Sequence, residues 1–254
     1  MNTFLRPDTL RQMRRRAYRD EHQLALGLGA RFLVRARELH VPVRGLVTCP
    51  ARLSPALHAL LRRQNAPRLE LDGRAYEELL GDSPASPIAT LFEQRWHRLP
   101  RGGRALWLAV GAIRSPGNLG TILRTGAAVG ARGVILLGSE PDPFHPTCVR
   151  ASMGAIYSLQ FVRSDAGHLR RWARRDRARV VGLSGDARLD FRRANYRGST
   201  VLLFGAERGG LTEAERRACK TLVRIPMTGE VDSLNVASAV AVASYEAQRQ
   251  RAIP

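Results

Sequence analysis

Three stretches of the chain place side chains that could hold a ligand directly after apolar runs. The first, GAIRSPGNLGTILRT, carries Asn118 and Arg124. The second, GAERGGL, carries Glu207, and the third, PMTGEVDSLNV, carries Ser233 and Asn235. In open α/β sheets the ligand binds outside the carboxyl ends of the strands, so residues that follow strands are the first candidates for a site.

The first stretch predicts a helix that begins at Asn118, a favourable N-cap residue. On this helix the apolar side chains share one flank and Arg124 points the other way. An arginine in that position is ordinarily just a solvated side chain. Its neighbours Thr121 and Thr125 are poor residues for a solvated face, however. They favour a cleft or a subunit contact around Arg124.

The second stretch is rich in glycine. Gly205, Gly209 and Gly210 allow a tight turn and a close approach of a ligand to the backbone. The helix that follows already has its own start signal, a T-x-x-E capping box at 212–215. Glu207 therefore has no evident structural duty. It is either a carboxylate of a site or a plain exposed glutamate.

The third stretch leads into a helix predicted for 231–246, whose body has no polar face. Ser233 is the expected N-cap of this helix. Capping and core packing account for Ser233 and for the helix body, but not for Asn235. Free N–H groups at a helix start also suit an electron-rich ligand. The small residues of the helix permit close approach of another helix or of a second subunit.

The elements that must position these side chains follow from the apolar pattern. From residue 104 to 254, short apolar runs alternate with helical ones, which indicates a parallel sheet with helices on both faces. The expected strands lie at 105–110, 133–137, 158–162, 179–183, 200–204 and 221–225, with helices between them. Before this domain, a basic leader at 1–19 precedes a small α/β domain at 20–97. That domain is expected to hold a helical run at 22–39, strands at 45–48, 68–71 and 88–93, and a turn at 81–87.

Composition limits the possible partners. The 254 residues carry a formal charge of +19, which implies a polyanion, either nucleic acid or an acidic membrane surface. Lys220 is the only lysine, and a genomic bias toward arginine could supply part of the charge. Nucleic acid is favoured, because arginine suits bidentate phosphate contacts and base stacking.

Cysteine and histidine spacing gives no sign of a disulfide framework or a metal site. Cys49, Cys148 and Cys219 lie far apart, and the six histidines form no ligand cluster. The amino-terminal residues are too charged for a signal peptide, and the longest apolar run is too short to span a bilayer. We therefore expect a soluble cytoplasmic protein that needs no metal and contacts no membrane.

Together the three stretches resemble the SpoU family of RNA ribose methyltransferases, in the SPOUT superfamily. Three ordered motifs at the right separations make this a specific signal, and the resemblance covers about residues 104 to 250, including RASMGAIYSLQF. The residues that match the family motifs are Asn118 and Arg124 in the first, Gly205, Glu207, Gly210 and Leu211 in the second, and Ile225, Pro226, Met227, Gly229, Ser233, Leu234, Asn235 and Val236 in the third.

The resemblance implies an α/β fold in which the carboxyl-terminal segment forms a deep trefoil knot. It also implies a homodimer with each active site near the subunit contact. S-adenosylmethionine would bind within the knotted loops, at Gly205, Gly210, Ile225, Met227 and Leu234. Residues 20–97 resemble, more weakly, the RNA-binding domain of rRNA-modifying members. Their FLVRAREL segment lacks a glutamate–glycine pair usual there, and Ala237 replaces a frequent serine of the third motif.

The implied reaction is methyl transfer from a sulfonium to a ribose 2′-hydroxyl of RNA, with 23S-type rRNA as the expected substrate. The implied catalytic residues are Arg124, Asn118, Glu207, Ser233 and Asn235. Family accounts sometimes make Arg124 a general base, but a guanidinium with a pKa above about 12 is poorly suited to that task. A clamp on the RNA phosphate that stabilises the developing alkoxide is the preferred role. The sequence leaves both roles open.

Three other interpretations compete. A tRNA ribose methyltransferase is the alternative enzyme, and the long amino-terminal domain without a terminal basic helix favours rRNA. A non-catalytic RNA- or ribosome-binding factor of the same fold would be equally basic, but it need not retain the site side chains. A Rossmann enzyme would need G-x-G-x-x-G after its first strand. ALGLGARF, at 25–32, lacks the third glycine and shows no strand pattern before it.

Overall fold

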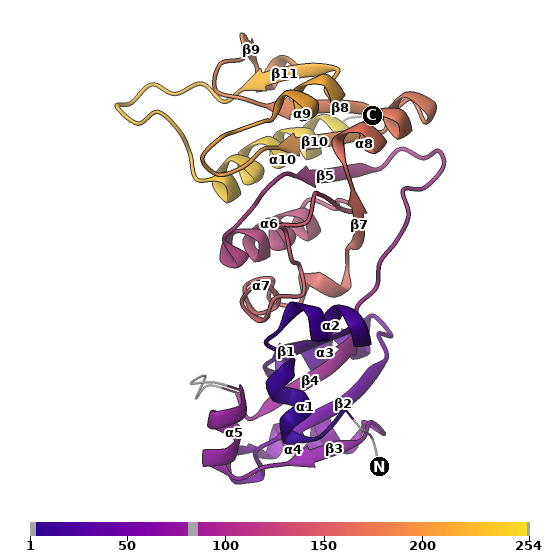
Figure 1. The fold of residues 1–254 in the computed structure, drawn as a ribbon, viewed down its shortest axis with the longest axis vertical. Coiled ribbons are helices and arrows are strands. Elements are labelled where there is room, and N and C mark those ends of the chain that lie inside the picture. Colours follow the sequence, from indigo (N-terminus) through magenta and orange to yellow (C-terminus); the bar gives the residue numbers. More distant parts are fainter. Residues whose placement is uncertain (1–3, 81–85, 253–254) are drawn as a thin grey trace. The chain divides into compact units, whose positions relative to one another are not determined.

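A computed structural model describes residues 4–80 and 86–252, and the chain divides into two compact units (Figure 1). The first unit comprises Met1–Arg95 and Phe144–Tyr157, and the second comprises Trp96–Pro143 and Ser158–Pro254. Residues 144–157, although inside the range 104–254 expected for one domain, group with the first unit. Most of the turn expected at 81–87 lies outside the described residues.

The first unit is built on a four-stranded mixed sheet in the order β1-β4-β2-β3. Strand β4 pairs antiparallel with β1 and β2, whereas β2 and β3 are parallel. Its strands are β1 (Leu24–Leu28), β2 (Val43–Thr48), β3 (Arg68–Glu70) and β4 (Ile88–Glu93). Its helices are α1 (Pro7–Gln12), α2 (Arg16–His22), α3 (Ala30–Glu38), α4 (Pro55–Arg62), α5 (Gly73–Leu80) and α7 (Pro146–Ala151), with 3₁₀ turns at Pro50–Arg52 and Ala155–Tyr157.

The basic segment at 1–19 contributes to the core of this unit. Leu10 and Met13 are buried together with Leu24, Tyr76 and Leu91 in one apolar cluster. Burial of two large side chains gives α1 a reason to fold that its six residues alone would not supply, because short isolated helices are marginal in water.

The helical run expected at 22–39 is wrong in its first half, where β1 occupies Leu24–Leu28. A short, largely buried apolar run has no period that separates strand from helix, and antiparallel pairing with β4 decides the outcome. Gly29, with φ near +120°, ends the strand, and α3 begins at the next residue. A strand thus precedes Gly29 after all. Its sheet is mixed and the third glycine is absent, so the Rossmann interpretation still fails.

The second unit is a seven-stranded sheet in the order β7-β6-β5-β10-β8-β11-β9, parallel at every pairing. Its strands are β5 (Leu106–Val110), β6 (Gly133–Leu137), β7 (Gln160–Ser164), β8 (Arg179–Leu183), β9 (Leu189–Asp190), β10 (Thr200–Phe204) and β11 (Thr221–Arg224). Its helices are α6 (Pro116–Ala128), α8 (Ala166–Arg175), α9 (Glu213–Ala218) and α10 (Val236–Ala252), with a 3₁₀ turn at Phe191–Arg193. The short edge strand β9 was not expected from the sequence.

Helices cover both faces of this sheet, as the apolar strands predict. Trp107 of β5 belongs to the cluster that contains Leu169 and Trp172 of α8. A Cβ added at Gly126 of α6 would lie 3.0 Å from Cδ1 of Leu108, the next residue of β5. Because successive strand residues point to opposite faces, α8 and α6 lie on opposite sides of the sheet. The predicted α/β architecture is confirmed. The trefoil knot is not tested by the strand order and stays a prediction.

Two helix starts differ from those expected. Helix α6 begins at Pro116 with Ser115 as its N-cap, so Asn118 lies within the first turn of the helix. Proline is preferred in the first turn because its missing N–H has no partner to lose there. Helix α10 begins at Val236, so Ser233 lies outside it. The Asn235 carboxamide oxygen accepts a hydrogen bond from the Ala237 N–H at 2.9 Å and does the capping expected of Ser233.

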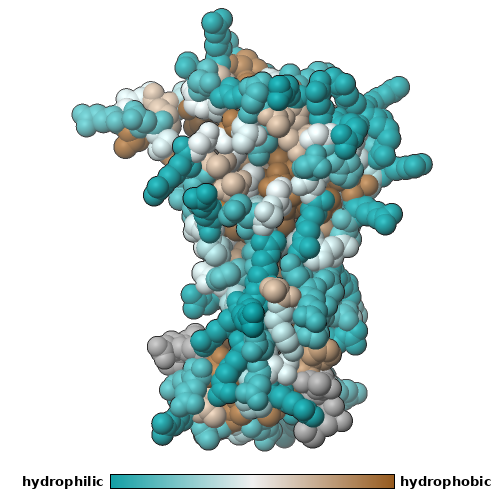
Figure 2. Space-filling model, in the orientation of Figure 1, coloured by the Kyte–Doolittle hydropathy of each residue, from teal (hydrophilic) through white to brown (hydrophobic). Residues whose placement is uncertain are grey.

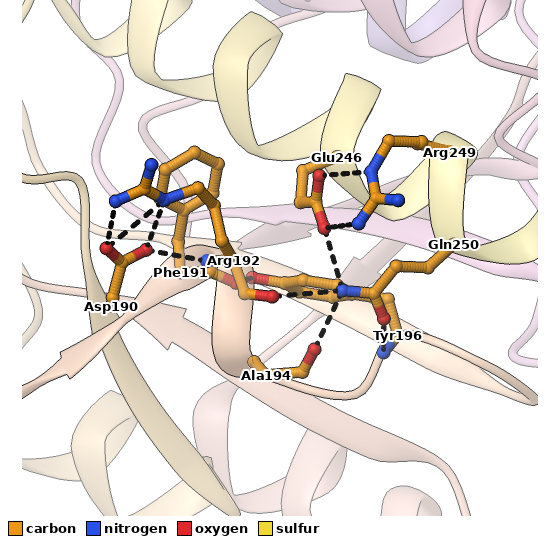
Figure 3. Close-up of polar contacts among 8 residues, drawn as sticks. All are labelled: Asp190, Phe191, Arg192, Ala194, Tyr196, Glu246, Arg249 and Gln250. Atoms are coloured by element: carbon orange, nitrogen blue, oxygen red, sulfur yellow. Dashed lines mark hydrogen bonds and ion pairs between the residues drawn. The ribbon is translucent and has the colours of Figure 1, made fainter.

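The far end of α10 is fastened by a polar network (Figure 3). The Gln250 carboxamide nitrogen donates to the carbonyl oxygen of Ala194 at 3.0 Å, and its carboxamide oxygen accepts from the Tyr196 N–H at 3.2 Å. The same nitrogen donates to the Glu246 carboxylate at 2.8 Å. The Arg251 guanidinium adds bonds to the Tyr196 and Gly198 carbonyl oxygens. These partners precede β10, so the helix is held at both of its ends.

In the described parts of the chain, helices long and apolar enough to cross a bilayer are absent.

Candidate active site

The first turn of α6 fixes the position of Asn118. Ser115 follows β5 by five residues, and its hydroxyl accepts a hydrogen bond from the Asn118 N–H at 3.3 Å. Ser115 and Asn118 therefore both lie at the carboxyl end of β5. Asn118 is placed there by its location in the first turn and not by capping.

The loop after β10 presents Glu207. Ala206 and Gly210 exchange two backbone hydrogen bonds, at 2.9 and 3.0 Å, which close a tight turn around the glutamate. Only glycine fits at Gly205, because an added Cβ would lie 2.1 Å from the backbone of Gly210. Gly210 itself has φ near +62°, which side chains disfavour. These glycines therefore shape the turn that carries the carboxylate. The capping box predicted after it, between Thr212 and Glu215, is confirmed.

Three motif side chains meet at this edge of the sheet. The Asn118 carboxamide nitrogen donates to the Glu207 carboxylate, and the Asn118 carboxamide oxygen accepts from the Asn235 carboxamide at 3.3 Å. One asparagine thus joins the loops that follow β5, β10 and β11, although the three residues lie far apart in the sequence. Glu207 has a partner after all, and the duty that the sequence could not identify is to orient Asn118.

A hollow of about 560 Å³ lies beside this cluster. Its walls include Arg114, Ser115, Glu207 and Arg208, together with small residues of the two loops. The sequence interpretation missed Arg114 and Arg208. Each lies four residues beyond the end of a strand, β5 or β10, and this position is the signal that would have identified them. The hollow combines cations with a carboxylate that a hydrogen bond holds in place.

Arg124 does not join the cluster within one chain. It is exposed on α6, and it makes no hydrogen bond or ion pair with any residue that the structure describes. Six residues separate it from Asn118, which places it about 9 Å further along the helix axis and on another side. A role for Arg124 in the same site would need substrate or a second subunit beside α6.

The loop at 225–235 projects from the second unit between β11 and α10 (Figure 1). Met227 and Leu234 are each 38 % exposed, Ser233 is exposed and Ile225 is half-buried. Figure 2 shows both hydrophilic and hydrophobic residues on this projecting loop. Large apolar side chains left open beside a strand end are suited to cover the flat face of an aromatic base.

Metal and thiol chemistry find no support in the geometry. Within residues 4–80 and 86–252, no group of three or more His, Cys, Asp or Glu side chains is arranged to hold a metal ion. Cys49 and Cys148 are buried and are not joined in a disulfide. Burial raises the pKa of the Cys219 thiol to about 12, so this side chain is neutral at physiological pH.

Residues 105–245 match the SpoU rRNA Methylase family, which is more than half of the chain. The chain therefore belongs to this family, and the family predicted from the three motifs is confirmed.

The chain is 33 % identical, over 237 residues, to the 23S rRNA (uridine(2479)-2′-O)-methyltransferase of Streptomyces viridochromogenes, covering 89 % of this chain and 83 % of that one. It is 37 % identical over 154 residues to the 23S rRNA (guanosine-2′-O-)-methyltransferase RlmB of Xylella fastidiosa, covering 60 % and 61 %. The crystal structure of the SpoU methyltransferase AviRb from Streptomyces viridochromogenes, in complex with AdoMet, superposes with a TM-score of 0.88 at 31 % identity, covering 96 % of this chain and 97 % of that one.

Proposed function

We propose that this protein transfers a methyl group from S-adenosylmethionine to a ribose 2′-hydroxyl of RNA, with 23S-type rRNA as the substrate. The observation that carries the proposal is the hydrogen-bonded set of Asn118, Glu207 and Asn235, which unites the three motifs at the carboxyl edge of the parallel sheet. The AdoMet named in the AviRb complex and the rRNA named for both relatives support the same cofactor and substrate class. An rRNA substrate would place the protein in the cytoplasm.

The residues of the second unit fit S-adenosylmethionine. Gly205 and Gly210 shape a loop that a ligand can approach closely, and Ile225, Met227 and Leu234 offer partly open apolar side chains for the adenine ring. When bound, the cofactor supplies an activated methyl group on a sulfonium. The protein has to hold the ribose hydroxyl in line with that group and stabilise the oxygen as it loses its proton.

Asn118 is the central positioning residue in this proposal. Its two carboxamide atoms are occupied by Glu207 and Asn235, so the side chain cannot rotate without breaking a bond at each end. Ser233, exposed two residues before Asn235, is free to donate to a ribose or a cofactor oxygen. The exposed guanidinium of Arg124 clamps the RNA phosphate and stabilises the developing alkoxide, and its planar fork suits that task better than proton abstraction.

The proposal includes a homodimer, because Arg124 stands apart from the other site residues within one chain. Helix α6 packs on α10. On α10, Val242 and Tyr245 are 39 % and 54 % exposed. Large apolar side chains left open on a helix are characteristic of a surface that a partner covers. A second subunit seated on these helices would bring its own side chains beside Arg124.

The first unit is proposed to hold the RNA. Arg62, Arg68 and His58 line a hollow of about 420 Å³ between α4 and β3. Arginine around a concave surface suits contacts to RNA phosphates. A tRNA substrate is the alternative within the same chemistry, and methyl transfer to rRNA and tRNA transcripts separates the two.

The test combines cofactor binding with methyl transfer. Calorimetry of the full chain with S-adenosylmethionine, and with its demethylated product, should give saturable binding without added metal. Radiolabelled methyl transfer should then be measured to unmodified 23S rRNA, 16S rRNA and tRNA transcripts. Transfer to 23S rRNA that disappears when the target ribose is replaced by 2′-deoxyribose supports the proposal. Binding of neither ligand would leave the non-catalytic RNA-binding factor as the better interpretation.

The dimer is tested by light scattering of the full chain, which should give twice the chain mass of 28.1 kDa. Tyr245→Glu introduces a charge into the proposed contact and should produce monomers, whereas Arg188→Glu, on an exposed loop far along the chain, should not. A well-folded wild-type monomer would exclude the dimer without affecting the cofactor test.

A further inference from the structure

A second hollow in the same unit, of about 470 Å³, is surrounded by positive charge. Its lining includes six cationic side chains: Arg170, Arg174, Arg177, Arg179, Arg217 and Lys220. The remaining lining residues are apolar side chains and Cys219, and no carboxylate is among them. Cys219 is a neutral thiol because burial raises its pKa. The hollow therefore presents cations without an internal counter-charge.

This basic hollow lies at the edge of the sheet opposite the candidate active site. Arg179 is the first residue of β8, and Lys220 directly precedes β11. Asn118 and Glu207 instead follow the last residues of β5 and β10. All four strands are parallel and neighbouring, so the two sites are separated by at least the length of a five-residue strand, about 16 Å. The proposed methyl-transfer site does not use these cations.

Local structure explains only part of the cluster. Arg174 and Arg217 lie in the last turns of α8 and α9, where cations interact favourably with the helix dipole. Arg217 also faces Glu213 at 3.7 Å, and Arg179 donates to two backbone carbonyl oxygens. The helix dipole favours Arg174 alone among Arg170, Arg174 and Lys220, and it gives no reason for these three to converge on the same hollow, where like charges repel. These three side chains are exposed and form no ion pair with a described residue.

We propose that this hollow, which we call the basic pocket, binds backbone phosphates of a folded RNA at a distance from the methylated nucleotide. The inference rests on RNA being the substrate, as proposed above. Five of the six cations are arginines, whose forked guanidinium groups suit phosphate oxygens. An RNA that touches both edges of the sheet must be folded or wide enough to span them. The basic pocket would then select structured RNA over a short single strand.

The test is the salt dependence of RNA binding. The triple variant Arg170→Gln, Arg174→Gln and Lys220→Gln removes three charges from the basic pocket. A matched control, Arg188→Gln, Arg193→Gln and Arg197→Gln, removes three exposed arginines of the same unit that do not line it. Binding of an unmodified 23S rRNA transcript is measured from 50 to 300 mM KCl. Each lost phosphate contact lowers the slope of log affinity against log salt by about 0.7–0.9.

We expect the pocket variant to lose about two units of slope and at least tenfold in affinity at low salt, and the control to keep its slope within about half a unit. Cofactor affinity and the single-turnover rate at saturating RNA should stay at the wild-type level in both. Equal slopes for the two variants would overturn the proposal. Saturable binding of tripolyphosphate with no difference in RNA slope would also overturn it, because the hollow would then be a small-anion site.

Three further outcomes each have a defined interpretation. If the triple variant fails to unfold cooperatively, Arg170→Gln and Lys220→Gln, which lie on separate elements, are measured singly, and each should remove about 0.7 units of slope. If the wild-type protein methylates no RNA, yet the slopes differ as expected, the methyltransferase proposal fails and the phosphate site stands. Loss of folding stability without a change in slope would assign the cations to the helix ends alone.

Discussion

The two edges of the parallel sheet carry opposite kinds of polar surface. At the carboxyl edge, Asn118, Glu207 and Asn235 hold one another by hydrogen bonds, and most of their polar atoms have assigned partners. At the amino edge, the basic pocket gathers six cations and no carboxylate. Hydrogen bonds fix orientation, which chemistry requires, whereas a cluster of positive charge attracts a polyanion. The carboxyl edge of the sheet is thus suited to reaction, and the amino edge is suited to binding.

Helix α10 spans the two edges. Its first turn follows Asn235 at the carboxyl edge, and its last turn reaches Gly198 and Arg104, which precede β10 and β5. Seventeen residues at about 1.5 Å each cover roughly 25 Å, which is more than the length of any strand in the sheet. Anchoring at the amino edge therefore fixes the helix that positions Asn235, and variants at each end can test how far the edges act independently.

The largest effect is expected for Arg124. Arg124→Ala should fold, dimerise and bind S-adenosylmethionine normally, because the side chain is exposed and has no partner among the described residues. Methyl transfer should fall by at least about 100-fold, the scale seen when a charge-stabilising donor is removed. Single-turnover methylation at saturating cofactor provides the measurement. A wild-type rate would show that Arg124 does not belong to the site. The hydrogen-bonded set of Asn118, Glu207 and Asn235 would then act at the carboxyl edge without it.

Arg124→Lys separates the two mechanisms that the sequence leaves open. Lysine keeps the positive charge but loses the planar fork, and it can deprotonate at high pH. A phosphate clamp predicts that the lysine variant fails nearly as badly as the alanine variant at every pH. A general base predicts partial recovery as the pH rises, so rates from pH 6 to 10 distinguish the two.

The next effect concerns the coupling within the carboxyl edge. Asn118→Ala and Glu207→Ala should each lower the rate by about 10- to 100-fold, since each breaks the same hydrogen bond. The double variant should be little worse than either single one, giving a coupling energy of about 1–3 kcal/mol. Additive losses would mean that the two side chains act separately. Cofactor affinity is measured alongside, to distinguish lost positioning from lost binding.

The sequence predicted the parallel sheet well and the first unit less well. Wholly apolar strands such as β5 and β6 are recognisable from the sequence, because both of their faces are covered. The run at Leu24–Leu28 is equally apolar, yet it was assigned to a helix, because helical periodicity resumes directly after it. Only the pairing with β4, more than sixty residues further along the chain, makes it a strand.

The sequence predicted which residues belong to the site better than it predicted how they are arranged. Asn118 and Asn235 were identified, but the cap roles assigned to Asn118 and Ser233 belong to Ser115 and Asn235. Capping depends on where a helix begins, and α6, with a proline in its first turn, has its N-cap three residues before the expected one. The basic pocket was not predicted, because its arginines come from three elements and look individually like solvated side chains.

The end of α10 at the amino edge can be tested by measuring the free energy of unfolding. Gln250→Ala removes a side chain whose carboxamide bonds to the 194–196 backbone and to Glu246 (Figure 3), and it should cost about 1–3 kcal/mol of unfolding free energy. Gln248→Ala is the matched control, because Gln248 is half-buried and forms no hydrogen bond with a described residue. Urea denaturation gives both values. If the edges act independently, the methylation rate of Gln250→Ala at low temperature stays at the wild-type level.

The smallest expected effect is the loss of stability in acid that arises from Glu246 at this end of α10. The hydrogen bond from Arg249, above all, lowers the pKa of the Glu246 carboxyl from its usual value of 4.5, and Gln250 donates a second bond that acts in the same direction. A carboxyl whose pKa is lower in the folded state than in the unfolded state stabilises the fold fully above its unfolded pKa. That contribution disappears as the pH falls through the lower folded value.

Wild-type protein should therefore lose stability relative to Glu246→Gln between about pH 5 and pH 3, by less than about 1 kcal/mol, because Arg249 is largely solvated. Asp190, whose pKa the Arg192 hydrogen bonds lower to about 2, titrates below this window and is common to both proteins. Unfolding midpoints in urea across the pH range provide the comparison. The hydrogen bond between Asn118 and Asn235 at the carboxyl edge contains no titrating group. If wild-type protein and Glu246→Gln lose equal stability in acid, the pH response does not come from the Glu246 anchor.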